Sequence, residues 1–203
     1  MANWRNITKK IKASPRTLKE AKKTAKKVLD EEKAKLLSEF NNHPVTQEIE
    51  MGPLAPNISN TLNGYGNLFT FIGFNKGHDP IETVRLMLSQ LVRLKKVSIN
   101  QGSAPRIEIQ YQAPTINDFK GATPLPWESG RSWVIGIETG ISGFGSYMYE
   151  KTYKGSRSGM GFQAKSGPKL SFPMQIRSGR FKNVKYMSNM LRNFYKKLRE
   201  RTK

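Results

Sequence analysis

The chain has 203 residues, enough for one ordinary domain with a single hydrophobic core. Its 35 Lys and Arg residues outnumber its 15 Asp and Glu residues, so the formal net charge is +20 at pH 7. The absence of cysteine excludes disulfides, thiolate zinc sites and a cysteine nucleophile. Because so large a surplus of positive charge repels itself, we expect an acidic partner: nucleic acid, an acidic protein or a membrane surface.

The positive charge is concentrated at the two ends of the chain. Residues 1–40 contain 12 basic and 5 acidic side chains, residues 180–203 contain 9 basic and 1 acidic, and residues 41–179 contain 14 basic and 9 acidic. This distribution suggests four parts: a basic N-terminal arm (1–13), an α+β core domain (14–138), a loop or arm rich in glycine, aromatic and basic residues (139–180), and a basic C-terminal helix (181–203) that packs on the core or on a neighbour.

The sequence contains no segment typical of secretion or membrane insertion. Residues 1–5 lack the apolar run of a signal peptide. No apolar stretch approaches the ~18 residues that a membrane span needs. We therefore expect a soluble protein, synthesised in the cytoplasm, without a membrane partner.

The first predicted element is a long amphipathic helix. Ser14 suits the N-cap, Pro15 suits the first helical position, and apolar residues recur at helical spacing as far as Phe40. The other face is rich in lysine, and it is either a solvated face or a face laid against DNA or an acidic ring. The candidates for an interface or a polyanion contact on this face are Lys19, Lys22, Lys23, Lys26 and Lys27.

Short apolar runs predict the next elements. Weak alternation over residues 44–50 and the aromatic run over residues 67–74 are typical of short strands, the second of them buried. Asp79 and Pro80 predict the start of a second helix, because aspartate caps well and proline fits the first helical position.

A β-hairpin and one more strand follow the second helix. Residues 95–100 and 106–111 alternate in polarity around a turn-rich linker, which predicts a hairpin. Residues 113–131 contain several prolines and are predicted to be a loop, and the apolar run over residues 132–138 predicts another strand.

The closing helix has the clearest periodicity in the chain. Its apolar residues step by three and four positions, which predicts a narrow seam against the sheet or against a neighbouring subunit. These apolar residues are Val184, Met187, Leu191, Phe194 and Leu198, and the basic interface candidates on the remaining surface are Arg192, Lys196, Lys197 and Arg199. The order of elements predicts an α+β fold, with a small antiparallel sheet packed with a long N-terminal helix, a middle helix and a basic C-terminal helix, plus extended loops.

Aromatic and basic residues are interleaved through the glycine-rich stretch before that helix. Aromatic rings stack on nucleic-acid bases while cations follow the phosphates, and the same residue types anchor protein interfaces, so both readings stay open. The candidates from this stretch are Tyr147, Tyr149, Tyr153, Lys154, Arg157, Phe162, Arg177 and Arg180.

No pattern in the sequence points to catalysis. Its two histidines, His43 and His78, sit beside turns, and no paired-histidine spacing supports a metal site. The glycine clusters lack the lysine and hydroxyl of a phosphate-binding loop, and the acidic residues of the middle region are scattered. We therefore predict a protein that is not an enzyme and has no catalytic residues, metal or cofactor.

Three stretches of the middle region are distinctive: HPVTQEI from His43, NISNTL from Asn57 and GYGNLFTFIGF from Gly64. They resemble stretches of the neck and tail-completion proteins of contractile-tailed, T4-like bacteriophages. The layout over residues 16–200 is also similar: a long first helix, a small sheet with a helix, an aromatic loop and a basic closing helix.

The resemblance implies a structural virion protein at the head–tail junction that is not an enzyme. It implies a homo-oligomeric ring, with a hexamer favoured over a dodecamer, which joins the head connector to the tail tube or its terminator and lets genomic DNA pass. A strongly positive channel would retain DNA, so we expect much of the charge to face other proteins. The alternative prediction is a basic nucleic-acid-binding protein without catalytic activity, which follows from the charge alone.

Overall fold

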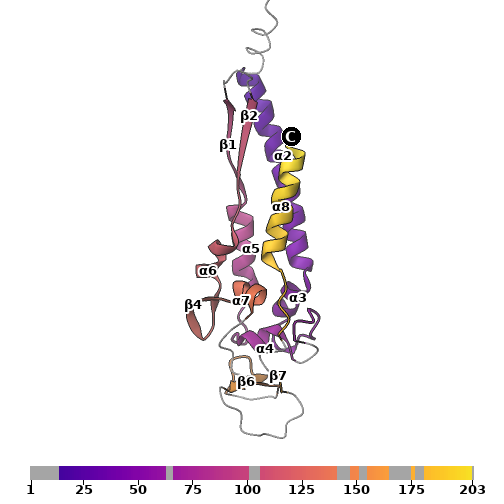
Figure 1. Cartoon of the computed structure of the whole chain (residues 1–203), viewed down its shortest axis with the longest axis vertical. Coiled ribbons are helices and arrows are strands. Elements are labelled where there is room, and N and C mark those ends of the chain that lie inside the picture. Colours follow the sequence, from indigo (N-terminus) through magenta and orange to yellow (C-terminus); the bar gives the residue numbers. More distant parts are fainter. Residues whose placement is uncertain are drawn as a thin grey trace, which may run out of the picture.

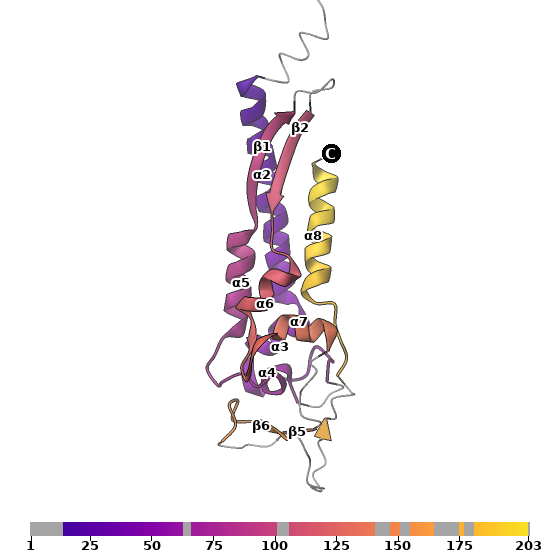
Figure 2. The same ribbon diagram turned by 60° about the vertical axis from the view of Figure 1, so that its left-hand side comes forward.

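The computed structural model describes residues 14–62, 66–100, 106–140, 147–150, 155–164, 175–176 and 181–202. These residues form an elongated α+β structure, as predicted (Figure 1). A long helix, α2 (Pro15–Asn42), runs along most of the length, with a β-hairpin and the last helix, α8 (Met187–Arg201), beside it (Figure 2). The short helices lie toward the end of the molecule where α2 finishes.

Helix α2 begins and ends where the sequence places its caps. The Ser14 hydroxyl accepts a hydrogen bond of 3.2 Å from the Thr17 N–H, and proline follows the cap, where no N–H is needed. The helix stops at His43 because the next residue, Pro44, disfavours helical backbone in the residue before it. Its buried stripe includes Leu29, Leu36 and Phe40 and forms one wall of the core.

Three segments predicted as strands are helices. They are α3 (Pro44–Glu50), α4 (Leu68–Ile72) and α7 (Trp133–Thr139). Each has a side-chain cap: His43 Nδ1 accepts from Val45 N–H at 3.2 Å, Asn67 Oδ1 from Thr70 N–H at 2.9 Å, and Ser132 Oγ from Ile135 N–H at 3.2 Å. The runs of α4 and α7 are apolar because these two short helices are buried on most sides. Because nearly all of their residues are apolar, these short runs lack the alternation of polar and apolar faces by which a helix is recognised in a sequence.

The second helix and the hairpin are confirmed. A single helical turn, η1 (Gly52–Leu54), follows α3, and α5 (Pro80–Leu91) begins at Asp79, whose carboxylate accepts from the N–H groups of the first turn. Strands β1 (Arg93–Asn100) and β2 (Arg106–Gln112) pair antiparallel, with an irregularity between Leu94 and Lys96.

The region predicted as a loop over residues 113–131 contains short regular elements. These are η2 (Ile116–Asp118), α6 (Phe119–Ala122) and the antiparallel pair β3 (Pro124–Leu125) and β4 (Glu128–Ser132). The stretch 139–180, predicted as a loop or arm, includes a three-stranded antiparallel sheet of β5 (Tyr147–Glu150), β6 (Gly161–Ala164) and β7 (Gln175–Ile176), in the order β6-β5-β7.

Helix α8 packs mainly on α2, whereas the seam was expected to meet the sheet or a neighbouring subunit. Met187, Leu191, Phe194 and Leu198 of the predicted seam are buried in the same core cluster as the α2 stripe. The same core cluster includes Ile49 of α3, Phe69 of α4 and Trp133 of α7, all of them buried. The fold therefore fixes the long helices side by side and leaves their basic faces outside.

Candidate basic assembly surface

The lysines of α2 form the first basic face. Lys19, Lys22, Lys23, Lys26 and Lys27 are all exposed, and none forms a salt bridge with a residue in the described part of the chain. They are exposed because the buried stripe of α2 occupies the opposite side of the same helix. We call these five residues the α2 lysine face.

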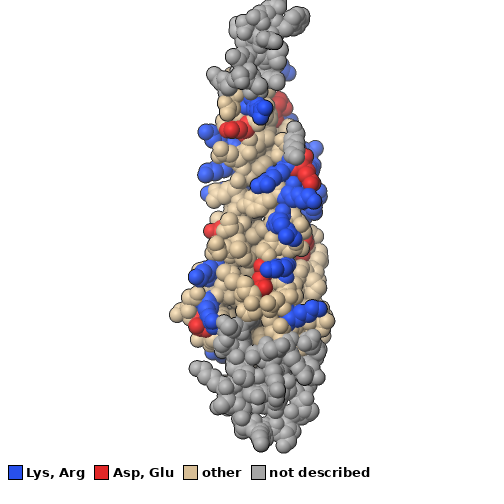
Figure 3. Space-filling model, in the orientation of Figure 1, with Lys and Arg blue, Asp and Glu red and all other residues tan. Residues whose placement is uncertain are grey.

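The basic residues of α8 form a second face. Arg192 donates to Asn189 Oδ1 at 2.6 Å, and Lys196 lies 4.0 Å from the Glu200 carboxylate. Lys197 and Arg199 are exposed without an ion pair among the described residues. Basic side chains are spread along the length of the visible surface and are more abundant there than acidic ones (Figure 3).

Arg201 ties the end of α8 to the middle of α2. Its guanidinium lies 2.6 Å from Glu31 Oε2 and 2.7 Å from Glu32 Oε1, and Lys35 contacts the same Glu32 oxygen at 2.7 Å. The hydrogen bond from Arg201 lowers the pKa of Glu31. Burial alone would raise the pKa of Glu32, but the hydrogen bonds from Lys35 and Arg201 together hold it below its ordinary value. Arg201 thus stabilises the packing of α8 on α2, whereas Lys197 and Arg199 form no ion pair among the described residues.

A buried carboxylate fixes the other end of α8. Glu138 in α7 is only 7% exposed, and its Oε1 accepts a hydrogen bond of 2.6 Å from the Ser188 N–H, in the first turn of α8. A negative charge at a helix N-terminus is stabilised by the unpaired N–H groups and the helix dipole. The backbone N–H of Val184 also donates to the Ile137 carbonyl at 3.1 Å. These contacts set the direction in which α8 presents its basic face.

A second buried carboxylate joins α3 to the loop after η1 and to α4. Glu48 in α3 is fully buried and accepts from Asn57 Nδ2 at 3.1 Å, Ser59 N–H at 2.8 Å and Leu68 N–H at 2.7 Å. The carboxylate thereby anchors the loop after η1 and the first turn of α4. This role of Glu48 could not be predicted from local sequence patterns, because its partners are up to 20 positions away.

Arg157 forms two hydrogen bonds within the protein from an exposed position. Its Nε donates to the Gly73 carbonyl at 2.8 Å, and its own carbonyl accepts from Lys76 N–H at 2.9 Å. Gly73 has a φ of +83°, and a Cβ there would lie 3.1 Å from the Arg157 guanidinium, so glycine suits both the turn and the contact. Arg157 therefore joins the segment after β5 to the end of α4, while its side chain stays exposed.

The other candidates from the glycine-rich stretch cannot be placed by their side chains. Tyr147, Tyr149 and Phe162 belong to β5 and β6, where only the backbone is described. Tyr153, Lys154, Arg177 and Arg180 lie outside the described residues, as does the N-terminal arm at residues 1–13.

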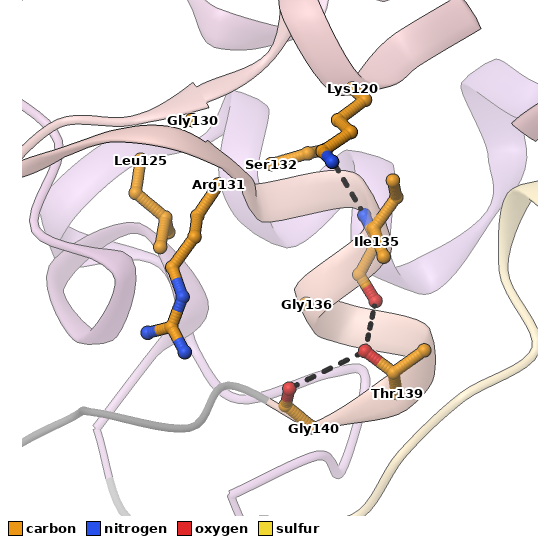
Figure 4. A pocket seen from close by; sticks show the side chains of 9 residues that line it. All are labelled: Lys120, Leu125, Gly130, Arg131, Ser132, Ile135, Gly136, Thr139 and Gly140. Atoms are coloured by element: carbon orange, nitrogen blue, oxygen red, sulfur yellow. Dashed lines mark hydrogen bonds between the residues drawn. The ribbon is translucent and has the colours of Figure 1, made fainter. Parts of the chain in front are cut away.

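A small hollow lies between α6, β4 and α7. Its volume is about 270 Å³, and Lys120, Arg131, Ile135 and Gly136 are among its lining residues (Figure 4). Arg131 is already paired with Glu128 at 3.0 Å, and Thr139 donates to the Ile135 carbonyl at 2.9 Å. The hollow contains no acid–base pair with which to move a proton.

Within the described residues, no group of three or more His, Asp or Glu side chains lies close enough to hold a metal ion. None of the helices there is both long enough and apolar enough to span a membrane. No protein-family model, curated protein or solved structure matches the chain, so the arrangement of its own residues carries the functional argument.

Proposed function

We propose that the chain is a structural virion protein of the phage neck, which forms a ring that joins the head connector to the tail. The observation that carries the proposal is the pair of exposed basic faces on α2 and α8, held on two helices that are rigidly joined. Cations on a fixed framework suit contact with an acidic neighbouring ring, because all of them except Lys196 lack an ion pair among the described residues.

The resemblance to neck and tail-completion proteins supports the proposal. Its three stretches meet around Glu48, where α3, the loop at residues 57–62 and α4 come together. A region stabilised by buried hydrogen bonds rather than arranged around a cleft suits a scaffold for assembly. The proposal takes the ring to be a hexamer, with a dodecamer as the alternative.

Native mass spectrometry and electron microscopy of the purified chain test the proposal. We expect a closed ring, or a complex with connector or tail proteins added in stoichiometric amounts. A matched variant with Lys19, Lys22, Lys23, Lys26 and Lys27 changed to Gln should stay folded and lose the complex. A chain that stays monomeric with every connector and tail protein would contradict the proposal.

The α2 lysine face also favours a second candidate, a nucleic-acid-binding protein without catalytic activity. Five exposed lysines on one helix form a row of cations that can follow a phosphate backbone. Affinity for DNA and RNA, measured against salt concentration, separates the two candidates. A steep fall of affinity with salt and tight binding at physiological salt favour this function, and a shallow dependence with weak binding excludes it.

A further inference from the structure

A groove runs between strand β2 and helix α8. The groove is a hollow of about 410 Å³, extended at one end by a hollow of about 630 Å³ between α2 and the hairpin and at the other by a hollow of about 580 Å³ on α8 beside Thr115. The middle hollow shares Ile109 and Thr202 with the hollow beside α2, and Tyr195 and Arg199 with the hollow beside Thr115, so the three follow one another along α8. In Figure 2, β2 lies between β1 and α8.

The edge of β2 borders this groove. Ile109, Gln110 and Tyr111 all line the middle hollow, and consecutive strand residues point to opposite faces, so the strand meets the groove along its edge. Within the described chain, β2 is hydrogen-bonded to one strand, β1, and no backbone hydrogen bond reaches it from α8. Every second residue of such a strand directs its N–H and C=O away from its partner, and these groups form a template for another strand.

The groove has an apolar floor and a basic rim. Ala21 and Ala25 of α2, with Ile99 and Ile107 of the hairpin, line the hollow between α2 and the hairpin, and Ile107 is 40% exposed. The basic residues along the groove are Lys95, Arg106, Arg192, Lys196, Arg199 and Arg201, and the acidic residue lining it is Glu200. Arg201 is neutralised by Glu31 and Glu32, but Lys95 and Arg199 have no ion pair in the described part.

One polar atom in the wall of the groove lacks a partner. The Tyr111 hydroxyl is buried and has no hydrogen bond within the described structure, and burial raises the pKa of this phenol. A buried hydroxyl without a partner is destabilising, so an acceptor or donor brought by a ligand would be favourable here.

We propose that the groove binds an extended segment of another protein, which adds to β2 as a third strand and alternates apolar with acidic residues. The backbone of the segment pairs with the free edge of β2, as in other cases of strand addition. Its apolar side chains continue the face formed by Ile107 and Ile109, and its acidic side chains meet Lys196 and Arg199. A second copy of the chain is a poorer occupant, because its net charge of +20 would meet a rim of the same sign.

The inference rests on the proposed function only in taking the partner to be a protein, and it names that partner's chemistry. Its test uses the full chain and two synthetic peptides of 7 residues, the length of β2. One peptide alternates Glu and Val, and the other has the same composition with all Glu residues before all Val residues. Calorimetry gives the affinities, and hydrogen exchange read by mass spectrometry gives the protected amides.

We expect the alternating peptide to bind about tenfold or more tightly than the block peptide, and to protect amides of β2. The double variant K196E/R199E should bind it about tenfold more weakly, since two attractions become repulsions. The control K22E/K26E has the same net charge but alters the opposite side of α2, and it should bind normally. Tyr111→Phe should weaken binding without lowering the unfolding midpoint, because the hydroxyl is unpaired without the peptide.

Equal affinity for both peptides would show that charge attraction alone explains binding and would overturn the proposal. The same conclusion would follow if K22E/K26E lost as much affinity for the alternating peptide as K196E/R199E does. So would a bound peptide that is helical by circular dichroism and leaves β2 unprotected. A change of oligomeric state in K196E/R199E with peptide binding intact would assign the groove to a second copy. If the chain forms rings with its neck partners but binds neither peptide, this inference fails while the proposed function stands.

Discussion

The carboxylate of Glu138 in α7 accepts a hydrogen bond of 2.6 Å from the backbone N–H of Ser188 in α8. The contact joins two segments that are 50 positions apart and places a buried negative charge at the N-terminus of the most basic helix. Glu138 thus places a carboxylate at the N-terminus of α8, while Lys197 and Arg199 near the C-terminus of the helix remain exposed.

Replacing Glu138 with Gln should lower the free energy of unfolding by about 1–2 kcal/mol, because the charge that caps α8 is lost while the shape is kept. Chemical denaturation measures the change. Glu128→Gln is the matched control, since it removes an exposed pair with Arg131 and should cost less than about 1 kcal/mol. Equal losses in the two variants would show that Glu138 does not act as a cap.

His43 should make stability depend on pH. Burial lowers the pKa of its imidazole in the folded chain below the ordinary value of 6.5. As the pH falls below 6.5, the unfolded chain therefore binds a proton at His43 more readily than the folded chain does. Stability is therefore complete above pH 6.5 and falls as the pH decreases, since a proton on Nδ1 also breaks the 3.2 Å cap to Val45. His43→Asn keeps a cap acceptor and should flatten the curve of unfolding free energy between about pH 7 and pH 5. An unchanged curve would exclude His43 as the cause.

Arg201→Met should lower the unfolding midpoint, because Glu32 is buried and would retain only Lys35 as its cation. The loss should be largest above pH 4.5, where the carboxylates of Glu31 and Glu32 are charged, and should shrink as the pH falls through their lowered pKa values. Arg199→Met is the control and should leave the midpoint unchanged. A drop of equal size in both variants would argue against the role of Arg201.

The hydroxyl of Tyr186 is paired with Thr46 Oγ1 at 2.5 Å in the core, and burial strongly raises the pKa of this phenol. Tyr186→Phe should cost about 1–2 kcal/mol of unfolding free energy, because the Thr46 hydroxyl is left without its partner. The double variant T46V/Y186F should recover part of this loss, since both polar groups are removed. A double-mutant cycle with no coupling energy would contradict the pairing.

Changing the five lysines of the α2 lysine face to Gln should leave the free energy of unfolding within about 0.5 kcal/mol, because none is paired within the described chain. The same variant should lose association with an acidic partner. A variant in which Lys33 alone is changed to Gln is the contrast: its ammonium contacts the carbonyls of Ser89 and Val92 at the end of α5, so it should be destabilised while assembling normally.

Long periodic helices and the hairpin could be predicted from the sequence, and α3, α4 and α7 could not be predicted from apolar runs alone. The capping residues of α4 and α7 do indicate helices. Asn67 precedes α4 and Gly73 follows it at a φ of +83°, and Ser132 and Gly140 bracket α7 in the same way. Asparagine or serine before a short run, with glycine after it, indicates a helix even where the residues are all apolar.

The exposed lysines of α2 followed directly from its amphipathic pattern, whereas the contacts that position them did not. Glu138 and Ser188, or Arg201 and Glu31, are paired across distances in sequence that no local pattern encodes. Arg157 was predicted as an interface cation, and its side chain is exposed; the hydrogen bond that its Nε also donates to the Gly73 carbonyl could not be predicted, because the two residues are 84 positions apart.

Electron microscopy of purified virions carrying a tagged copy of the chain tests the central claim most directly. The proposed function predicts label at the junction of head and tail, in a ring of uniform stoichiometry, and its loss when the α2 lysine face is changed to Gln. Absence of the chain from the particles, or label only at another position along the tail, would contradict it.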